Sequence, residues 1–164
     1  MTIEEYLNSA DDYDKKEYNM ELVAKYPWCI PPNGYDEWGN EVTSDYDFSW
    51  TMLDGIPDGW RIAFCDRMCD EIQKEYEKLP DDKKKDFYIV QAKEKFGGLR
   101  IYMTFYVDSI ESIIQKYSEL SEITCVQCGK PASYISRGWI CPWCNEHTRD
   151  NLDDYVKIED WFKE

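Results

Sequence analysis

The chain of 164 residues carries 34 acidic and 19 basic side chains, which gives a formal net charge of -15. A field of this sign repels phosphate backbones, so we do not expect direct binding to nucleic acid. No stretch approaches the roughly 20 consecutive apolar residues that span a bilayer, and the acidic N-terminus lacks the apolar core of a signal peptide. We therefore expect a cytoplasmic protein that binds no membrane.

Acidic side chains concentrate in the N-terminal third. Residues 1–55 carry 13 acids and 3 bases, whereas residues 124–148 carry 1 acid and 2 bases. Such a surface keeps a protein soluble, and it also suits a partner with a basic surface. Aromatic residues make up 16% of the chain, unlike the composition of disordered segments, so most of the chain should fold.

The first third of the chain predicts two helices and then an irregular segment. Residues 3–7 fit a short helix, and residues 13–26 fit a longer one that stops at Pro27, because proline cannot continue a helix. Residues 35–58 have no clear period. We expect the aromatic side chains of this segment to wrap it around the core, with at most one or two short strands.

The clearest helix is predicted over residues 58–79, where apolar residues form one continuous stripe before Pro80. Cys65 and Cys69 lie on this stripe, four residues apart. That spacing can hold a metal ion or a redox pair. A free cysteine also behaves as a small hydrophobic residue, and we favour a core role for both, as for Cys29.

A β-hairpin and another helix follow. Residues 87–92 are rich in strand-forming side chains, and from Leu99 onward apolar and polar residues alternate with period two. Gly97 and Gly98 are expected to form the hairpin turn, since glycine adopts positive φ without penalty. Residues 108–122 return to helical spacing, with one apolar face.

Two cysteine pairs carry the strongest chemical signal in the chain. Cys125 and Cys128 are two residues apart, Cys141 and Cys144 likewise, and twelve residues separate the pairs. One tight turn can present both sulfurs of a pair to a metal, and a second turn completes a tetrahedron. The odd cysteine count and the missing secretory signal argue against a disulfide framework. We predict one structural Zn2+ bound by these four residues, with iron or a redox dithiol as alternatives.

His147 is the single histidine and lies three residues beyond Cys144. It could replace one thiolate or donate a hydrogen bond to one, but a surface position is the simpler interpretation. A lone histidine also argues against a serine or cysteine triad, because such a nucleophile needs a positioned base. Nucleotide-binding motifs are absent from the sequence. We therefore predict that the protein is not an enzyme.

Three basic residues, Lys93, Lys95 and Arg100, gather around the predicted hairpin turn. Together with turn amides they could contact an anion or a carboxylate of a partner. The simpler interpretation is that they are solubilising charges on a sheet edge, paired with the acidic N-terminal third.

These elements predict an α+β fold, in which a small antiparallel sheet packs against amphipathic helices and a zinc ribbon follows. Residues 1–123 would form the acidic α+β domain, residues 124–148 a four-cysteine ribbon packed on it, and residues 149–164 a short C-terminal helix or tail. The ribbon has too many large side chains to bury alone, Trp139 and Trp143 among them. We expect them to pack on the main domain, and an exposed patch for a partner is the alternative.

Four segments of the chain resemble segments of a known protein family. They are Lys25-Tyr26-Pro27-Trp28 with Ile30-Pro31, the segment from Leu53 to Trp60, the segment from Gln91 to Arg100, and the four-cysteine ribbon with Gly138-Trp139. Over roughly residues 21–147 the chain resembles a family of small proteins that occur widely in bacterial genomes and often in phage or prophage regions. Its most specific part is the Lys-Phe-Gly-Gly-Leu-Arg hairpin followed by the ribbon. The family has no agreed activity, so the resemblance implies a mobile-element protein that inhibits or redirects host machinery.

We therefore expect a zinc-containing binding protein, encoded by a phage or prophage, that acts through protein–protein interaction in the bacterial host cell. The alternative is an acidic inhibitor that mimics nucleic acid and blocks the basic groove of a host defence nuclease, of the anti-restriction or anti-CRISPR type. The expected partner is in both cases a protein.

Overall fold

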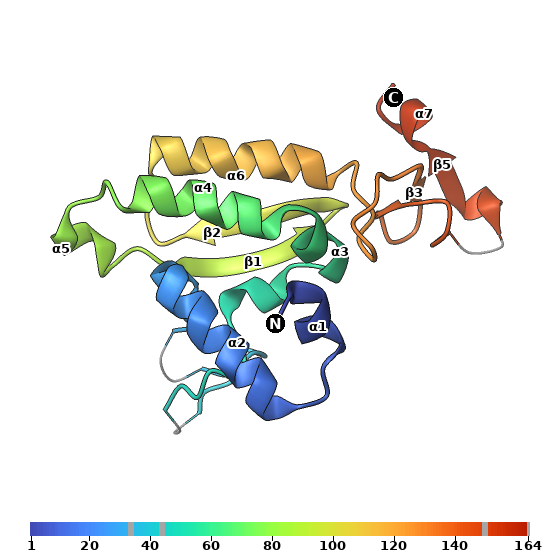
Figure 1. Ribbon diagram of the computed structural model, residues 1–164. Coiled ribbons are helices and arrows are strands. Elements are labelled where there is room, and N and C mark those ends of the chain that lie inside the picture. Colours follow the sequence, from blue (N-terminus) through green and yellow to red (C-terminus); the bar gives the residue numbers. More distant parts are fainter. Residues whose placement is uncertain (33–34, 43–44, 149–150, 164) are drawn as a thin grey trace.

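The computed structural model has the predicted α+β architecture, with a two-stranded hairpin at its centre (Figure 1). The structure describes residues 1–32, 35–42, 45–148 and 151–163. The hairpin consists of β1 (Ile89–Lys95) and β2 (Gly98–Met103). Helices α4 (Asp66–Tyr76) and α6 (Asp108–Ser121) run side by side along it, because each turns an apolar stripe toward the hairpin and toward the other helix.

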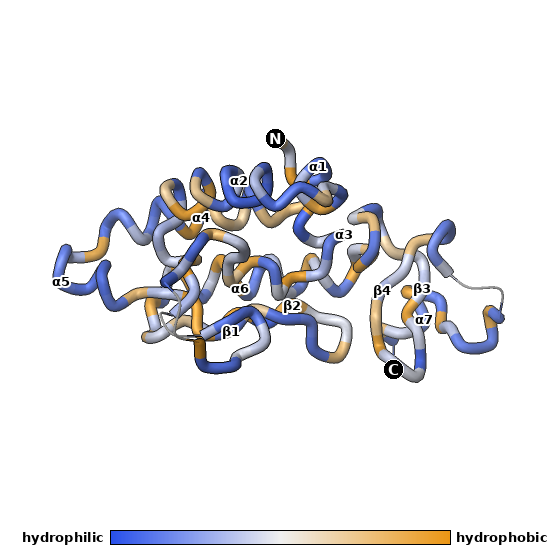
Figure 2. The backbone as a smooth tube through the Cα atoms, turned by 90° about the horizontal axis from the view of Figure 1, so that it is seen from below, coloured by the Kyte–Doolittle hydropathy of each residue, from blue (hydrophilic) through white to orange (hydrophobic). Residues whose placement is uncertain are grey.

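Both predicted N-terminal helices are present, α1 (Ile3–Asn8) and α2 (Asp12–Lys25). The hydroxyl of Thr2 and the carboxylate of Asp11 accept hydrogen bonds from the first turns of α1 and α2. Helix α2 ends where Pro27 begins a 3-10 turn, η1 (Pro27–Cys29). Helix α2 lies at the outside of the molecule in Figure 2, and its acidic residues are exposed, namely Asp12, Asp14, Glu17 and Glu21.

The irregular segment after residue 35 contains no regular strand in its described part, only an isolated bridge between Tyr35 and Glu41. A 3-10 turn, η2 (Met52–Gly55), lies near the end of this segment and packs along β1. Phe48 contacts the core as expected. Trp38 is 80% exposed, so the expectation that the aromatic residues wrap the core is wrong for this residue.

The predicted helix over residues 58–79 forms as one run with an irregular centre. It begins with α3 (Asp58–Trp60), continues through the π-helical turn η3 (Arg61–Cys65) and becomes α4. A short helix, α5 (Asp81–Lys84), follows Pro80. The π-helical turn includes Arg61, which is buried and donates to Asp54 Oδ1 over 2.6 Å. The apolar stripe therefore includes one buried arginine, paired with a half-buried aspartate, that its period does not predict.

Cys65 and Cys69 both lie in the hydrophobic core, with their sulfurs 3.9 Å apart, and Cys29 is fully buried in the same core. The core interpretation of these three cysteines is confirmed. Burial is the main reason why the pKa of Cys29 is raised to about 12, which keeps this thiol protonated at neutral pH.

Replacing both Cys65 and Cys69 with alanine should leave the metal content unchanged and lower the free energy of unfolding by about 1–3 kcal/mol, through lost packing. Urea unfolding and elemental analysis of the same preparation measure the two effects. A fall in metal content would show that these cysteines take part in metal binding.

The hairpin is confirmed, but its turn lies one residue earlier than expected. The turn residues are Phe96 and Gly97, with φ of 51° and 82°, and Gly98 already pairs with Lys95 in the ladder. Positive φ at both central residues is the hairpin geometry that follows the twist of the strands. Phenylalanine rarely adopts a positive φ, so the residue type at position 96 does not predict a turn.

Strand β2 alternates as predicted, with Leu99 and Ile101 buried and Tyr102 exposed. Its open edge is covered by α6. The hydroxyl of Ser118 donates to the Leu99 carbonyl over 2.9 Å, and the Leu99 N–H donates to Ser121 Oγ over 2.8 Å. Two serines thus satisfy the backbone groups that a free edge strand would expose.

The C-terminal ribbon is a three-stranded sheet in the order β4-β3-β5. Its strands are β3 (Tyr134–Ser136), β4 (Pro142–Trp143) and β5 (Tyr155–Lys157). Flanking turns are η4 (Leu152–Asp154) and α7 (Ile158–Trp161). The sequence predicts a short helix or tail here, but the described part of the tail supplies strand β5 to the ribbon. None of the described helices is long and apolar enough to cross a lipid bilayer.

Candidate metal centre

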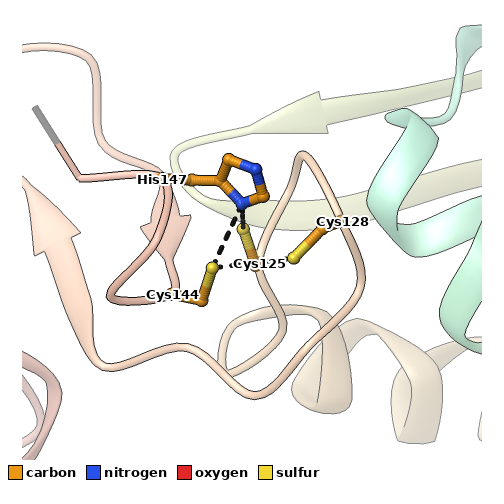
Figure 3. A group of neighbouring side chains, drawn as sticks. All are labelled: Cys125, Cys128, Cys144 and His147. Atoms are coloured by element: carbon orange, nitrogen blue, oxygen red, sulfur yellow. Dashed lines mark hydrogen bonds between the residues drawn. The ribbon is translucent and has the colours of Figure 1, made fainter.

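Four side chains of the ribbon converge on one point, as Figure 3 shows. They are Cys125, Cys128, Cys144 and His147, and their ligand atoms all lie within 4.8 Å of one another. Cys125 and Cys144 are buried, whereas Cys128 and His147 are half-buried. A group of three thiols and one imidazole is a donor set that structural metal sites use.

The spacing of the four atoms fits a single metal ion better than covalent linkage. The sulfurs of Cys128 and Cys144 are 3.6 Å apart, whereas a disulfide requires about 2.05 Å. Metal–sulfur bonds of about 2.3 Å in a tetrahedron separate two sulfurs by about 3.8 Å. His147 Nδ1 lies 3.7 Å from Cys125 Sγ and 3.1 Å from Cys144 Sγ. The cluster could therefore hold a metal ion.

Each pair of candidate ligands is presented by a tight turn. In the first turn the Gly129 N–H donates to the Cys125 carbonyl over 3.0 Å, and Gly129 has a φ of 80°. In the second the His147 N–H donates to the Cys144 carbonyl over 3.2 Å. The second turn therefore begins at Cys144 and not at Cys141.

Cys141 is the predicted ligand that the structure leaves out of the cluster. Between Cys141 and Cys144 the chain is extended in β4, which pairs with β3, instead of folding into a turn. Residues three apart in an extended chain point to opposite sides. The Cys141 thiol consequently faces away from the cluster, and His147 takes the fourth position. The expectation that His147 is a simple surface residue is wrong.

The Cys141 side chain is buried at the boundary between the ribbon and the hairpin. Burial raises the pKa of this thiol to about 12, and the nearby carboxylate of Glu94 adds to the shift. The Cys141 N–H donates to Ser136 Oγ over 3.1 Å. Cys141 therefore remains a protonated, packed thiol at neutral pH.

The first turn is fixed to the main domain through the start of α3. The Gly59 N–H donates to the Val126 carbonyl over 2.8 Å, and Trp60 Nε1 donates to the Thr124 carbonyl over 2.9 Å. The backbones approach so closely that a Cβ on Gly59 would lie 2.2 Å from the carbonyl oxygen of Cys125. Only glycine fits there, so the helix start positions the metal turn.

Replacing Gly59 with alanine should therefore disturb the ribbon. We expect a loss of at least about 2 kcal/mol in the free energy of unfolding, because backbone atoms must move to accept the methyl group. Gly138→Ala is the matched control, since a Cβ there meets nothing within 4 Å. Thermal unfolding compares the two, and equal stability of both variants would contradict the tight junction.

The pKa values of the two cysteines of the first turn shift in opposite directions. Burial alone would raise the pKa of Cys125, but N–H groups of Cys144, Cys128 and Gln127 outweigh it and lower that pKa to about 7. Burial and the neighbouring thiols raise the pKa of Cys128. One thiolate is thus partly formed at neutral pH before a metal binds, and a metal would displace the remaining protons.

The three basic residues of the hairpin lie apart from the cysteine cluster. Lys93 and Arg100 are directly opposite each other in the ladder, on the same face as Lys95. Arg100 donates to the Leu99 carbonyl and to Ser118 Oγ, over 3.1 and 3.3 Å. The Lys95 ammonium lies 5.7 Å from the centre of the Phe96 ring. The sequence predicts that these basic residues pair with the N-terminal third. Among the described residues, the hydrogen-bond partners of Arg100 lie instead on β2 and α6.

The position of Trp139 also differs from the predicted one. It was expected to pack on the main domain, yet it is 76% exposed at the tip of the loop between β3 and β4. Trp143 is half-buried. Ile140 lies against the hairpin turn at Gly97, and Ile135 is buried. The neighbouring Gly138, typical of a loop tip, was the available signal.

Comparison with protein-family models, curated proteins and solved structures gives no significant match.

Proposed function

We propose that the protein is a non-enzymatic binding protein in which one Zn2+, held by Cys125, Cys128, Cys144 and His147, fixes the shape of the ribbon. The observation that supports it is the closed set of four protein donors. Catalytic zinc sites keep a position open for water or substrate, whereas four thiolate and imidazole ligands complete a tetrahedron. Iron fits thiolate ligands too, but three cysteines with one histidine is a common set for structural zinc.

The proposed interaction is with a protein, because large apolar side chains are exposed on the ribbon and on the neighbouring hairpin turn. Trp139 at the loop tip and Phe96 at the hairpin turn are both largely exposed. Aromatic residues are enriched in protein–protein interfaces, where they act as anchors. The resemblance to bacterial and phage proteins supports a phage or prophage origin and a partner in the cytoplasm of the bacterial host.

A second candidate function is mimicry of nucleic acid by the acidic N-terminal third. The supporting observation is that most of the 13 acidic residues in residues 1–55 are exposed. Such a surface would attract the basic groove of a host nuclease. Binding of this kind is weakened strongly by salt and does not require the ribbon.

Affinity capture from a bacterial lysate separates the two functions. The bait is the full chain, and the matched bait carries Cys144→Ser in the metal centre. We expect a protein that is retained at high salt by the wild-type bait and lost with the variant. A protein that leaves both baits at high salt would favour mimicry, and identical capture by both baits at high salt would contradict binding through the ribbon.

A further inference from the structure

A pocket of about 880 Å³ lies where the ribbon meets the main domain. Its walls include three aromatic side chains, Trp139, Trp143 and Tyr155, and three carboxylates, Asp58, Glu94 and Asp154. We call it the Trp139 pocket. Its volume falls within the range of ligand sites, and it is formed by elements from both parts of the chain, namely α3, β1 and the ribbon.

The charge of the Trp139 pocket has one sign. Among the described residues that line it there is no lysine, arginine or histidine, and those other than the three carboxylates are uncharged. Glu94 is held in place, since its Oε1 accepts a hydrogen bond from the Gly97 N–H over 2.7 Å. Its carboxylate also lies beside the Cys141 thiol, which lines the same pocket. Three carboxylates without a lining cation favour a positively charged ligand.

The aromatic walls favour the same kind of ligand. The face of an indole ring attracts a cation more strongly than any other side chain. Trp143 is held by its Nε1, which donates to Ser136 Oγ over 3.0 Å, and the same hydroxyl donates to the carbonyl of Trp139. These hydrogen bonds hold the backbone of the loop that carries Trp139, which lowers the entropy cost of binding.

A second, smaller hollow of about 310 Å³ adjoins the first on Trp139. Phe96 and Ile140 supply its apolar surface, and Lys95, whose ammonium lies 5.7 Å from the centre of the Phe96 ring, lines it too. A free amine would fill only the charged pocket, whereas a peptide segment can place a charged side chain in one hollow and an apolar neighbour in the other. The pair of hollows therefore favours a segment of a protein.

We propose that the Trp139 pocket receives an arginine side chain from a basic surface segment of a protein partner, while an adjacent apolar residue packs against Phe96. This inference rests on the proposed function as a binding protein and specifies the chemistry of the partner. A guanidinium is planar, so it can stack on Trp139 and donate two parallel hydrogen bonds to a carboxylate such as Glu94. A lysine ammonium offers only a point charge.

The test measures binding of a fluorescein-labelled peptide, with an arginine and a leucine between glycines, to the full metal-loaded chain by fluorescence anisotropy. Trp139→Ala should weaken binding about tenfold, or about 1.4 kcal/mol. Trp38→Ala is the matched control, because Trp38 is equally exposed but lies outside the pocket. Glu94→Gln should weaken binding several-fold while it keeps an oxygen for Gly97, and Glu37→Gln should not. A lysine peptide should bind less tightly, and a glutamine peptide should not bind.

Several results would overturn the inference. Equal effects of Trp139→Ala and Trp38→Ala, or of Glu94→Gln and Glu37→Gln, would show that the peptide does not select the Trp139 pocket on a chain with a net charge of -15. Absence of saturable binding to the wild-type chain would also refute it. A partner captured from lysate that the arginine peptide does not displace would refute the pocket chemistry and leave the proposed function standing. Peptide binding that depends on Trp139, without any captured partner, would support the pocket and contradict the proposed function.

Discussion

Replacing Ile101 with aspartate should abolish the cooperative unfolding transition, while Tyr102→Asp should leave it nearly intact. Ile101 is 5% exposed and faces the core from β2, whereas its neighbour Tyr102 is 48% exposed on the other face. An unpaired charge in the core costs several kcal/mol, which is comparable to the whole stability of a small domain, about 5–15 kcal/mol. The exposed position should lose less than about 1 kcal/mol.

Circular dichroism during thermal and urea unfolding distinguishes the two variants. Because the substitutions introduce the same residue at adjacent positions of one strand, strand propensity is closely matched and burial is the main difference. If both variants unfold alike, the outer face of the hairpin is covered too, and the arrangement with helices packed on one face is wrong.

The hairpin and its helices were predictable because their signals are periodic. Alternation around Leu99 and Ile101 specifies which face is buried, and a shift of one residue would turn Arg100 inward. The sequence predicts the turn one position too late, because Gly97 and Gly98 are the adjacent residues whose type favours a hairpin turn. The actual choice of Phe96 and Gly97 depends on the ladder register, with Lys95 opposite Gly98, and on the contact of Gly97 with Ile140 of the ribbon.

The metal centre shows where spacing alone fails. A Cys-x-x-Cys turn and a Cys-x-x-His turn can both present two ligands to one metal ion. The segment from Cys141 to His147 therefore contains two overlapping candidate turns. Which one forms depends on whether Pro142 and Trp143 pair with β3, and that pairing is a long-range property of the fold. Sequence patterns describe local turns well and strand partners poorly.

The helix predicted for the C-terminal tail is wrong for the same reason, namely that strand pairing determines the structure of this segment. Apolar residues spaced at 152, 155, 156 and 161 fit a helix, but Tyr155, Val156 and Lys157 pair with β3 instead. An uncovered edge of β3 provides hydrogen bonds that a short isolated helix in water cannot match. Pairing with the ribbon therefore determines the secondary structure of this segment.

Metal content should separate the two possible ligand sets. Purified under reducing conditions, the wild-type chain should hold about one zinc. Cys144→Ser should reduce this to well below half an equivalent, because each ligand contributes to an apparent binding free energy of about 10–16 kcal/mol for structural zinc. Cys141→Ser should retain the full equivalent, since the Cys141 thiol lies outside the cluster. Elemental analysis of both proteins gives the answer.

The pair is well matched, because both cysteines are buried and belong to the same Cys-x-x-Cys motif. Circular dichroism shows whether each variant has folded, so that loss of metal is not confused with loss of structure. His147→Ala adds the reciprocal test. If four cysteines bind the metal, this variant keeps its zinc and Cys141→Ser loses it. If His147 is the fourth ligand, as the 3.1 Å distance from its Nδ1 to Cys144 Sγ indicates, the order is reversed, and the zinc of His147→Ala is removed by chelator concentrations that leave the wild-type site intact.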